Sequence, residues 1–291
     1  MTTIECVLDC GAELGEGPVW DPEDRVLYWV NIKDHEIHCF DPATSKDRLW
    51  NTPTDVGSLG LRRDGGMIVA LKTGFFFFDL QTGQFTAVAE PEANLADNRF
   101  NDGKTDRQGR FWAGSLYDPD ETKPTGSLYR LDTDLTCHKM VEGIYASNGL
   151  AFSADSATAY YADSRRRIVW AWDFDADDGA LRNRRVFIEL RDREGGPDGA
   201  AVDTDGGYWL TQPPAGRVVR YDPKGRVDRV IETPVSQPTC VAFGGERMDT
   251  LYITSAKYKM AADKLRREPL AGAIFAIRPG VTGPADVRFG G

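Results

Sequence analysis

The chain has 291 residues, of which 41% are hydrophobic and 11% aromatic, so it can bury the core of a globular protein. Its formal net charge at pH 7 is −10, and the basic triplet Arg165 to Arg167 lies close to Asp163. This charge argues against nucleic acids and anionic membranes as partners, and no apolar run is long enough to span a bilayer.

In chain order, the first recurring pattern is a polar turn followed by a strand of aromatic and β-branched residues. Its first copy runs from Asp21 to Val30 and reads Asp-Pro-Glu-Asp-Arg followed by Val-Leu-Tyr-Trp-Val. Further copies lie at residues 63–69, 106–112, 153–161, 203–209 and 245–252. Polar residues and Gly favour turns, whereas aromatic and β-branched residues favour strands, so each copy predicts one turn followed by one strand.

A second pattern follows each copy of the first: an apolar strand that ends in an aromatic or aliphatic residue, usually before Asp. The copies lie at residues 37–41, 76–79, 128–132, 169–173, 218–222 and 273–277, and the sixth lacks the Asp. Six units of roughly 40–50 residues with four strands each are typical of an all-β, six-bladed β-propeller. We expect residues 1–291 to form one such domain, in which the run from Ile4 to Leu8 pairs into the last blade.

One position recurs shortly before the turn in four of the six units. It is occupied by Glu16, Asn101, Asn148 and Asp198, and its equivalents in the second and sixth units fall near Gly57 and Thr239. One strand of each blade lines the channel of a propeller, so equivalent positions face a common axis. Converging carboxylate and amide oxygens repel one another unless a cation lies between them. The pattern therefore predicts a metal site at one mouth of the channel, of a kind that suits Ca²⁺, Mg²⁺ or Mn²⁺.

Each of these residues also has a simpler interpretation when it is taken alone. Glu16 lies in a Gly-Glu-Gly-Pro turn, and Asn148 and Asp198 each precede Gly in dipeptides that are common in turns. Turn chemistry does not explain, however, why oxygen-bearing side chains recur at the same position of several blades. The shared position therefore favours the metal site.

Other catalytic patterns are missing from the sequence. It contains no Gly-x-Ser-x-Gly elbow, no dinucleotide-binding glycine motif and no Walker loop. We interpret His35, His38 and His138 as structural or surface groups. The five cysteines include no Cys-x-x-Cys pair, and the N-terminus has no signal-peptide pattern, so we expect reduced thiols in a cytoplasmic protein.

Four motifs, which occur in order along nearly the whole chain, carry a family resemblance. They are Leu14-Gly15-Glu16-Gly17-Pro18, Asn98-Arg99-Phe100-Asn101-Asp102-Gly103-Lys104, Ser147-Asn148-Gly149 and Pro197-Asp198-Gly199. With these motifs the chain resembles the regucalcin/gluconolactonase family, which includes luciferin-regenerating enzymes, and it looks closest to bacterial lactonases of sugar acids. The resemblance implies a metal-dependent hydrolase that opens a sugar (aldono-) lactone to the sugar acid.

The same resemblance implies roles for five residues. Glu16, Asn148 and Asp198 would hold one divalent ion, which could be Ca²⁺, Zn²⁺, Mn²⁺, Mg²⁺ or Fe²⁺. Asp198 would also accept a proton during catalysis. Arg99 and Asn101 would contact the substrate, a small-molecule sugar lactone.

Some alternatives stay open at this point. Animal members of the family carry a substrate-contacting Glu after an Ala-Gly-Thr-Met run, whereas the matching position within residues 113–119 of this chain is not Glu. Arg99 alone could be a surface side chain paired with Asp97 or Asp102. A related esterase or phosphotriesterase and a non-enzymatic calcium-binding propeller are the alternative functions. We expect a monomer or a small homo-oligomer in each case.

Overall fold

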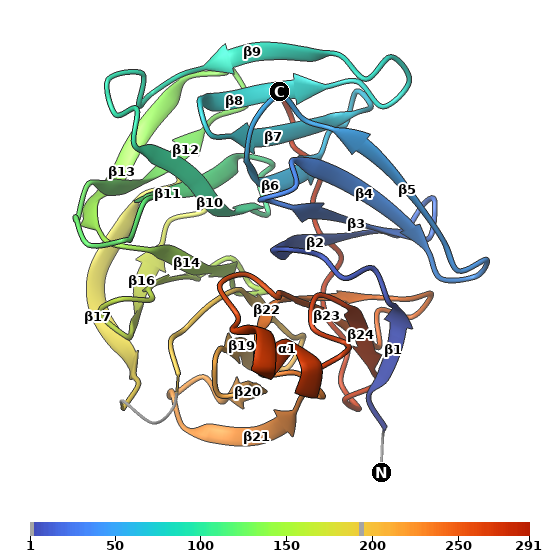
Figure 1. The fold of residues 1–291 in the computed structure, drawn as a ribbon. Coiled ribbons are helices and arrows are strands. Elements are labelled where there is room, and N and C mark those ends of the chain that lie inside the picture. The colour runs from blue at the N-terminus through green and yellow to red at the C-terminus, as the bar shows by residue number, and fades with distance from the viewer. Residues whose placement is uncertain (1–2, 192–194) are drawn as a thin grey trace.

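The computed structural model describes residues 3–191 and 195–291 and shows a ring of six four-stranded sheets (Figure 1). All strand pairs within the sheets are antiparallel, so the expected all-β, six-bladed propeller is confirmed. Within the described ranges the structure has one short α-helix, α1 (Ala262–Arg267), and no helix there has the length and apolar character needed to cross a membrane.

Each sheet forms one blade, and five of the six blades are built from four strands that are consecutive in the chain. The strands of the first three blades are β2 (Gly15–Asp21), β3 (Val26–Asn31), β4 (Glu36–Asp41), β5 (Lys46–Asn51), β6 (Val56–Leu61), β7 (Met67–Leu71), β8 (Gly74–Phe78), β9 (Phe85–Ala89), β10 (Asn98–Thr105), β11 (Phe111–Tyr117), β12 (Gly126–Leu131) and β13 (Cys137–Ile144). Those of the next two are β14 (Ser147–Phe152), β15 (Thr158–Asp163), β16 (Ile168–Phe174), β17 (Leu181–Glu189), β18 (Ala200–Val202), β19 (Tyr208–Gln212), β20 (Arg217–Tyr221) and β21 (Val227–Glu232).

The sixth blade joins the two ends of the chain. It contains β22 (Pro238–Gly244), β23 (Thr250–Ser255), β24 (Ile274–Ile277) and the N-terminal strand β1 (Glu5–Leu8). Glu5 lies opposite Ala276 and Leu8 opposite Ile274, so the predicted pairing of the N-terminal run with the last blade is confirmed. The pairing fastens the ring, which would otherwise leave β24 as an open edge between the termini.

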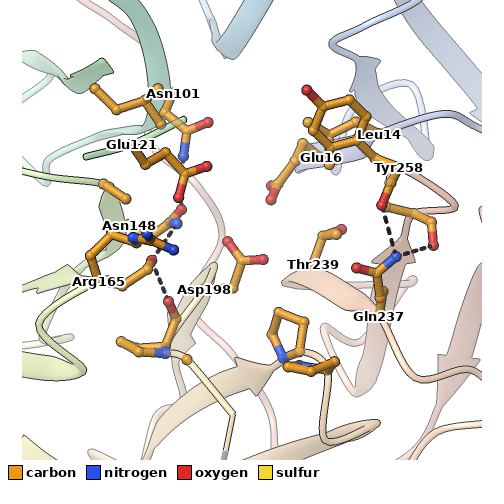
Figure 2. Close-up of a pocket in the computed structure, with 18 of the residues that line it drawn as sticks. Leu14, Glu16, Asn101, Glu121, Asn148, Arg165, Asp198, Gln237, Thr239 and Tyr258 are labelled. Carbon is orange, nitrogen blue, oxygen red and sulfur yellow. Dashed lines mark hydrogen bonds between the residues drawn. The ribbon is translucent and has the colours of Figure 1, made fainter. Parts of the chain in front are cut away.

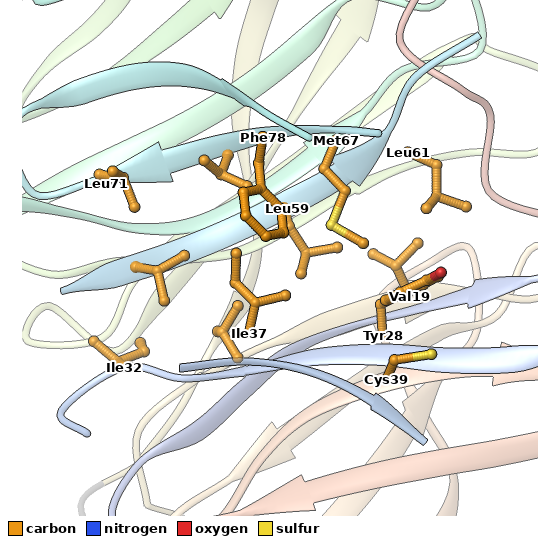
Figure 3. Packing of buried hydrophobic residues seen from close by; sticks show 13 residues of the cluster. Val19, Tyr28, Ile32, Ile37, Cys39, Leu59, Leu61, Met67, Leu71 and Phe78 are labelled. Atoms are coloured by element: carbon orange, nitrogen blue, oxygen red, sulfur yellow. The ribbon is translucent and has the colours of Figure 1, made fainter. Parts of the chain in front are cut away.

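Apolar side chains fill the space between neighbouring blades. Figure 3 shows the cluster between the first two blades, where Val30, Ile37, Val69 and Phe78 are at most 1% exposed. Sheets that are covered on both faces need apolar residues at successive positions, not at alternate ones. This requirement explains the nearly continuous apolar run of β3, Val-Leu-Tyr-Trp-Val.

The turn of the repeated pattern has a structural role in two blades. Asp106 and Asp203 begin their turns and are fully buried. Their carboxylates accept hydrogen bonds from Trp112 Nε1 at 2.9 Å and from Trp209 Nε1 at 2.7 Å, respectively. Asp203 also pairs with Arg220 at 2.7 Å. The turn Asp thus fixes the Trp of the following strand, which accounts for their constant spacing in these two copies.

The C-terminal segment crosses the end of the ring at which the innermost strands finish. The Phe289 side chain is fully buried there, and its backbone N–H donates to the Leu61 carbonyl oxygen at 2.7 Å. Earlier in the same segment, the Thr282 carbonyl oxygen accepts a hydrogen bond from the Thr204 N–H at 2.8 Å. These contacts link the segment to two blades that lie far apart in the sequence. The cavity described below opens at the other end of the ring.

Candidate functional site

A cavity of about 570 Å³ lies where the innermost strands begin, and all five residues singled out from the sequence line it. Figure 2 shows Glu16, Asn101, Asn148 and Asp198 around it. Its volume is within the range of small-molecule sites in proteins. The polar and charged side chains of the lining are Glu16, Arg99, Asn101, Glu121, Asn148, Ser164, Arg165, Arg167, Asp198, Gln237, Thr239 and Tyr258. The four residues at the repeated position, Glu16, Asn101, Asn148 and Asp198, therefore lie together as the register of the turns predicts, and Arg99 lies with them.

The innermost strands bend at the residues that face the cavity. The pairing of β2 with β3 shifts register just after Glu16, and the pairing of β14 with β15 shifts just after Asn148. The pairing of β10 with β11 shifts between Phe100 and Gly103, around Asn101. Such β-bulges re-aim side chains and are frequent beside active sites. They turn these side chains toward the mouth of the channel.

The two remaining ring positions carry residues that support the backbone of their neighbours. A Cβ atom on Gly57 would lie 2.4 Å from the Phe100 carbonyl oxygen, so no side chain fits between β6 and β10. The Thr239 hydroxyl donates to the Gly15 carbonyl oxygen, directly before Glu16. Gly57 and Thr239 thus hold the strands that present the polar residues.

Asn101 and Asn148 orient each other's amide groups. Asn101 Nδ2 donates to Asn148 Oδ1 at 2.9 Å and to the Ser147 carbonyl oxygen at 2.8 Å. Asn148 Nδ2 donates to Ser164 Oγ at 2.8 Å. Asn101 Oδ1 already accepts a bond from Arg99 Nη1 at 2.6 Å. Asn101 therefore turns its amide N–H groups toward Asn148, and its oxygen is bonded to Arg99. The sequence had predicted that this oxygen would face the metal together with those of Glu16, Asn148 and Asp198.

The Glu16 and Asp198 side chains point their carboxylates into the cavity (Figure 2). The Glu16 side chain is buried, and its carboxylate accepts the Gly17 N–H at 2.9 Å. Burial, reinforced by the charge of Asp102, raises the pKa of Glu16 to about 8. Burial and the charge of Glu16 raise the pKa of Asp198 well above its ordinary value of 3.8. Neither carboxylate forms an ion pair with a Lys, Arg or His of the described ranges.

This donor set fits a hard divalent cation. Two carboxylates that share a cavity without a cationic partner repel each other, and a divalent ion between them would cancel that repulsion. No three His, Cys, Asp or Glu side chains in the described part of the chain gather as a metal site by themselves. An ion at this place would therefore also need the amide oxygen of Asn148, and an all-oxygen set of this kind suits Ca²⁺, Mg²⁺ or Mn²⁺.

Arg99 is buried at the wall of the cavity. Its Nε atom lies 2.6 Å from Asp118 Oδ1, and its Nη1 atom donates to Asn101 Oδ1. Lys33 binds the same carboxylate at 2.9 Å. The alternative of a surface arginine paired with Asp97 or Asp102 is wrong, because Arg99 is only 4% exposed and pairs with Asp118.

The segment that departs from the family pattern also contributes to the cavity. Asp118 forms an ion pair with Arg99. The position that matches the substrate-contacting Glu of animal members is not Glu, but Glu121, a few residues further on, lines the cavity. Glu121 adopts a positive φ of 57° in the loop between β11 and β12. The repeated turns give no register for this loop, so sequence reasoning missed Glu121, and it missed Arg165, Gln237 and Tyr258 for the same reason.

The three histidines lie outside the lining of the cavity, as expected. His38 is buried, stacks on Trp29 with ring centroids 3.9 Å apart, and bonds Asp47 at 2.6 Å. His35 bonds Asp55 at 2.8 Å, and His138 lies 3.1 Å from Asp132. All three have carboxylate partners that fit a structural role. The five cysteines are free thiols.

Comparison with known proteins agrees with this geometry. Residues 14–257 match the model of the family described as SMP-30/Gluconolactonase/LRE-like region. The chain is 40% identical to a 6-deoxy-6-sulfogluconolactonase of Pseudomonas putida, with 99% of each chain covered. It is 35% identical to regucalcin of Xenopus laevis, with 99% of this chain and 98% of the relative covered.

Two solved structures share the whole fold. A calcium-binding protein, regucalcin, of Agrobacterium tumefaciens superposes with a TM-score of 0.95 at 29% identity, covering 99% of this chain and 97% of the other. A luciferin-regenerating enzyme superposes with a TM-score of 0.91 at 28% identity, covering 99% of both chains. Since the family model matches more than half of the chain and relatives above 30% identity span nearly all of it, the chain belongs to the SMP-30/gluconolactonase/LRE-like family.

Proposed function

We propose that the chain is a lactonase that opens a small sugar lactone to its acid with the help of one divalent ion. The observation that carries the proposal is the pair of carboxylates of buried Glu16 and half-buried Asp198, which share a cavity with Arg99 but form no ion pair with a described cationic residue. Support for the substrate class comes from the family and from the 40% identical relative, whose name denotes a sulfonated gluconolactone.

Glu16, Asn148 and Asp198 are the residues that would hold the ion. When bound, a divalent ion supplies positive charge that stabilises the oxyanion developing on the lactone carbonyl. Asp198 would accept the proton of the attacking water at its carboxylate, in the role of general base. Arg99, held by Asp118, donates to the oxygens of the sugar with the planar fork of its guanidinium group.

A substrate panel tests the class of reaction. The protein, supplied with each divalent ion in turn, is expected to hydrolyse aldonolactones at a higher kcat/KM than phosphotriesters or simple aryl esters. The reason is that the cavity lining is rich in polar groups that can pair with several hydroxyls at once, whereas an aryl ester leaves them unpaired. Faster turnover of a phosphotriester would replace the lactonase with a related esterase. Metal binding without hydrolysis of any ester would favour a non-enzymatic calcium-binding propeller.

Replacement of Arg99 tests the placement of the substrate. Arg99→Lys should lower kcat/KM for the best lactone by about ten- to a hundredfold, the loss expected for one charge-assisted hydrogen bond. A lysine keeps the charge but cannot bind Asp118, Asn101 and the substrate with one planar group. Steady-state kinetics with a metal titration gives the result, and metal affinity should change little.

The matched control for Arg99→Lys is Lys33→Gln. Lys33 pairs with the same Asp118 carboxylate but does not line the cavity. If Lys33→Gln lowers kcat/KM as much as Arg99→Lys does, both act by disturbing Asp118. If Arg99→Lys and Arg99→Ala both hydrolyse the lactone as fast as the parent, Arg99 has no contact with the substrate.

A further inference from the structure

The turn between β15 and β16 is fixed firmly beside the candidate metal site. The Asp163 carboxylate accepts the backbone N–H groups of Arg165 at 3.1 Å and of Arg166 at 3.3 Å. Ser164 Oγ donates to the Pro197 carbonyl oxygen at 2.6 Å and accepts a bond from Asn148 Nδ2 at 2.8 Å. The position of this turn is therefore coupled to Asn148 and to the segment that carries Asp198.

Three consecutive arginines in this turn have different surroundings. Arg166 Nη1 pairs with the Asp163 carboxylate and donates to the Gly143 carbonyl oxygen, and its guanidinium group lies 4.7 Å from the ring centre of Tyr145. Arg167 Nη1 donates to the Arg191 carbonyl oxygen at 3.3 Å. Both side chains thus have partners within the protein.

Arg165 lines the cavity (Figure 2), as Arg167 does, but its guanidinium group has different surroundings. No hydrogen bond or ion pair joins its guanidinium group to any residue in the ranges 3–191 and 195–291. The pKa of the nearby Asp120 is lowered mainly by hydrogen bonds from the hydroxyl and the N–H of Thr122, and the charge of Arg165 contributes least. Glu121 also lines the cavity, but no ion pair joins it to Arg165. Arg165 therefore offers a complete set of guanidinium donors to whatever enters the cavity.

The chemistry of a sugar lactone indicates which group the Arg165 guanidinium could bind. In an aldono-1,5-lactone, only the ring oxygen and one ring carbon separate the terminal carbon from the reacting carbonyl carbon. A charged group on the terminal carbon must therefore lie close to the ion when the carbonyl is bound there. Arg165 directly follows Ser164, which is bonded to the candidate ligand Asn148, and its side chain lines the cavity that such a lactone would enter.

We propose that Arg165 is an anion subsite that selects sugar lactones carrying a sulfonate or a phosphate on the terminal carbon. The inference rests on the proposed lactonase function and adds to it a charged class of substrate and the residue that binds its charged group. Sulfonate and phosphate share three outward oxygens around one centre, and guanidinium binds two such oxygens through parallel hydrogen bonds. Neutral aldonolactones lack this contact.

The test compares kcat/KM for three lactones: gluconolactone, its 6-phosphate and its 6-deoxy-6-sulfonate. In the parent protein, at least one charged lactone should be preferred over the neutral one, and the preference should weaken as salt screens the charge. Arg165→Gln should reduce the ratio of charged to neutral kcat/KM by about ten- to a hundredfold, mainly through KM. The two charged lactones together show whether the subsite favours sulfonate or phosphate.

The control is Arg166→Gln, which removes the same charge from the same turn but from a side chain that does not line the cavity. Its ratio of charged to neutral kcat/KM should equal that of the parent, and thermal melts establish that both variants fold. Equal ratios in the parent and in Arg165→Gln would overturn the subsite. Absence of hydrolysis of all three lactones by the parent would instead overturn the proposed function, so the two failures are distinguishable.

Discussion

Exhaustive chelation is expected to abolish lactone hydrolysis, and addition of one divalent ion should restore it. The expectation follows from Glu16 and Asp198, whose carboxylates share the cavity without an ion pair to a described cationic residue. Without the ion, the two carboxylates repel the negative charge that develops on the carbonyl oxygen. The measurement is the hydrolysis rate before chelation, after it, and during titration with Ca²⁺, Mg²⁺, Mn²⁺ and Zn²⁺. Full activity in a preparation shown by elemental analysis to be metal-free would contradict the proposal.

Glu16→Gln separates the loss of an ion from other effects of chelation. Burial raises the pKa of Glu16 to about 8 from its ordinary 4.5, so ionisation of Glu16 destabilises the metal-free fold increasingly as the pH rises between these values. The variant should therefore melt at a higher temperature than the metal-free parent at pH 8. Its metal affinity should fall by about tenfold or more, because the charge of the ligands tunes such sites.

Glu121→Gln is the control for Glu16→Gln, since Glu121 is a second glutamate of the same cavity outside the candidate ligand set. Its metal affinity should stay close to that of the parent. If the two variants bind the ion equally well, Glu16 is not a ligand. If chelation and re-addition change the activity while Glu16→Gln leaves both metal affinity and melting temperature unchanged, the ion binds elsewhere.

The ring position could be predicted from the sequence because the turn that follows it repeats. Glu16 and Asn148 stand at the same distance before their turns, and the structure places both where an innermost strand bends. A register of this kind needs no knowledge of distant contacts. The bends themselves could not be predicted, since the bulge depends on how β2 and β14 meet β3 and β15 in space.

The side chains that contact or surround the predicted residues could not be predicted from the sequence. Arg99 was correctly placed at the mouth beside Asn101, but its carboxylate partner is Asp118, from the loop end of β11. Glu121 and Arg165 come from the connections between the second and third strands of two blades, residues 118–125 and 164–167, which differ in length. Spacing rules hold along the repeated strands and fail in these connections, although the connections form much of the cavity wall.

Replacement of Asp198 by Asn should lower kcat for the lactone by about 10²–10⁴ in protein saturated with metal, the usual span for loss of a general base. The fold should persist, because the backbone holds this segment: the Asp198 N–H donates to the Thr211 carbonyl oxygen at 3.1 Å, and the Gly199 N–H donates to that of Thr239 at 2.7 Å. An Asn side chain can still offer an oxygen to the ion, but it cannot accept a proton from water.

Two carboxylates could act as the base, and the variants assign the role. Glu16→Gln should recover most of the parent's kcat once the metal is saturating, whereas Asp198→Asn should not recover it at any metal concentration. Asp102→Asn controls for the loss of a negative charge, because Asp102 is buried near both carboxylates but does not line the cavity. A loss of kcat in Asp102→Asn as large as in Asp198→Asn would mean that charge, not proton transfer, sets the rate. Parent-like turnover in metal-saturated Asp198→Asn would exclude Asp198 as the base and would leave Glu16, the other carboxylate of the cavity, as the group that activates water.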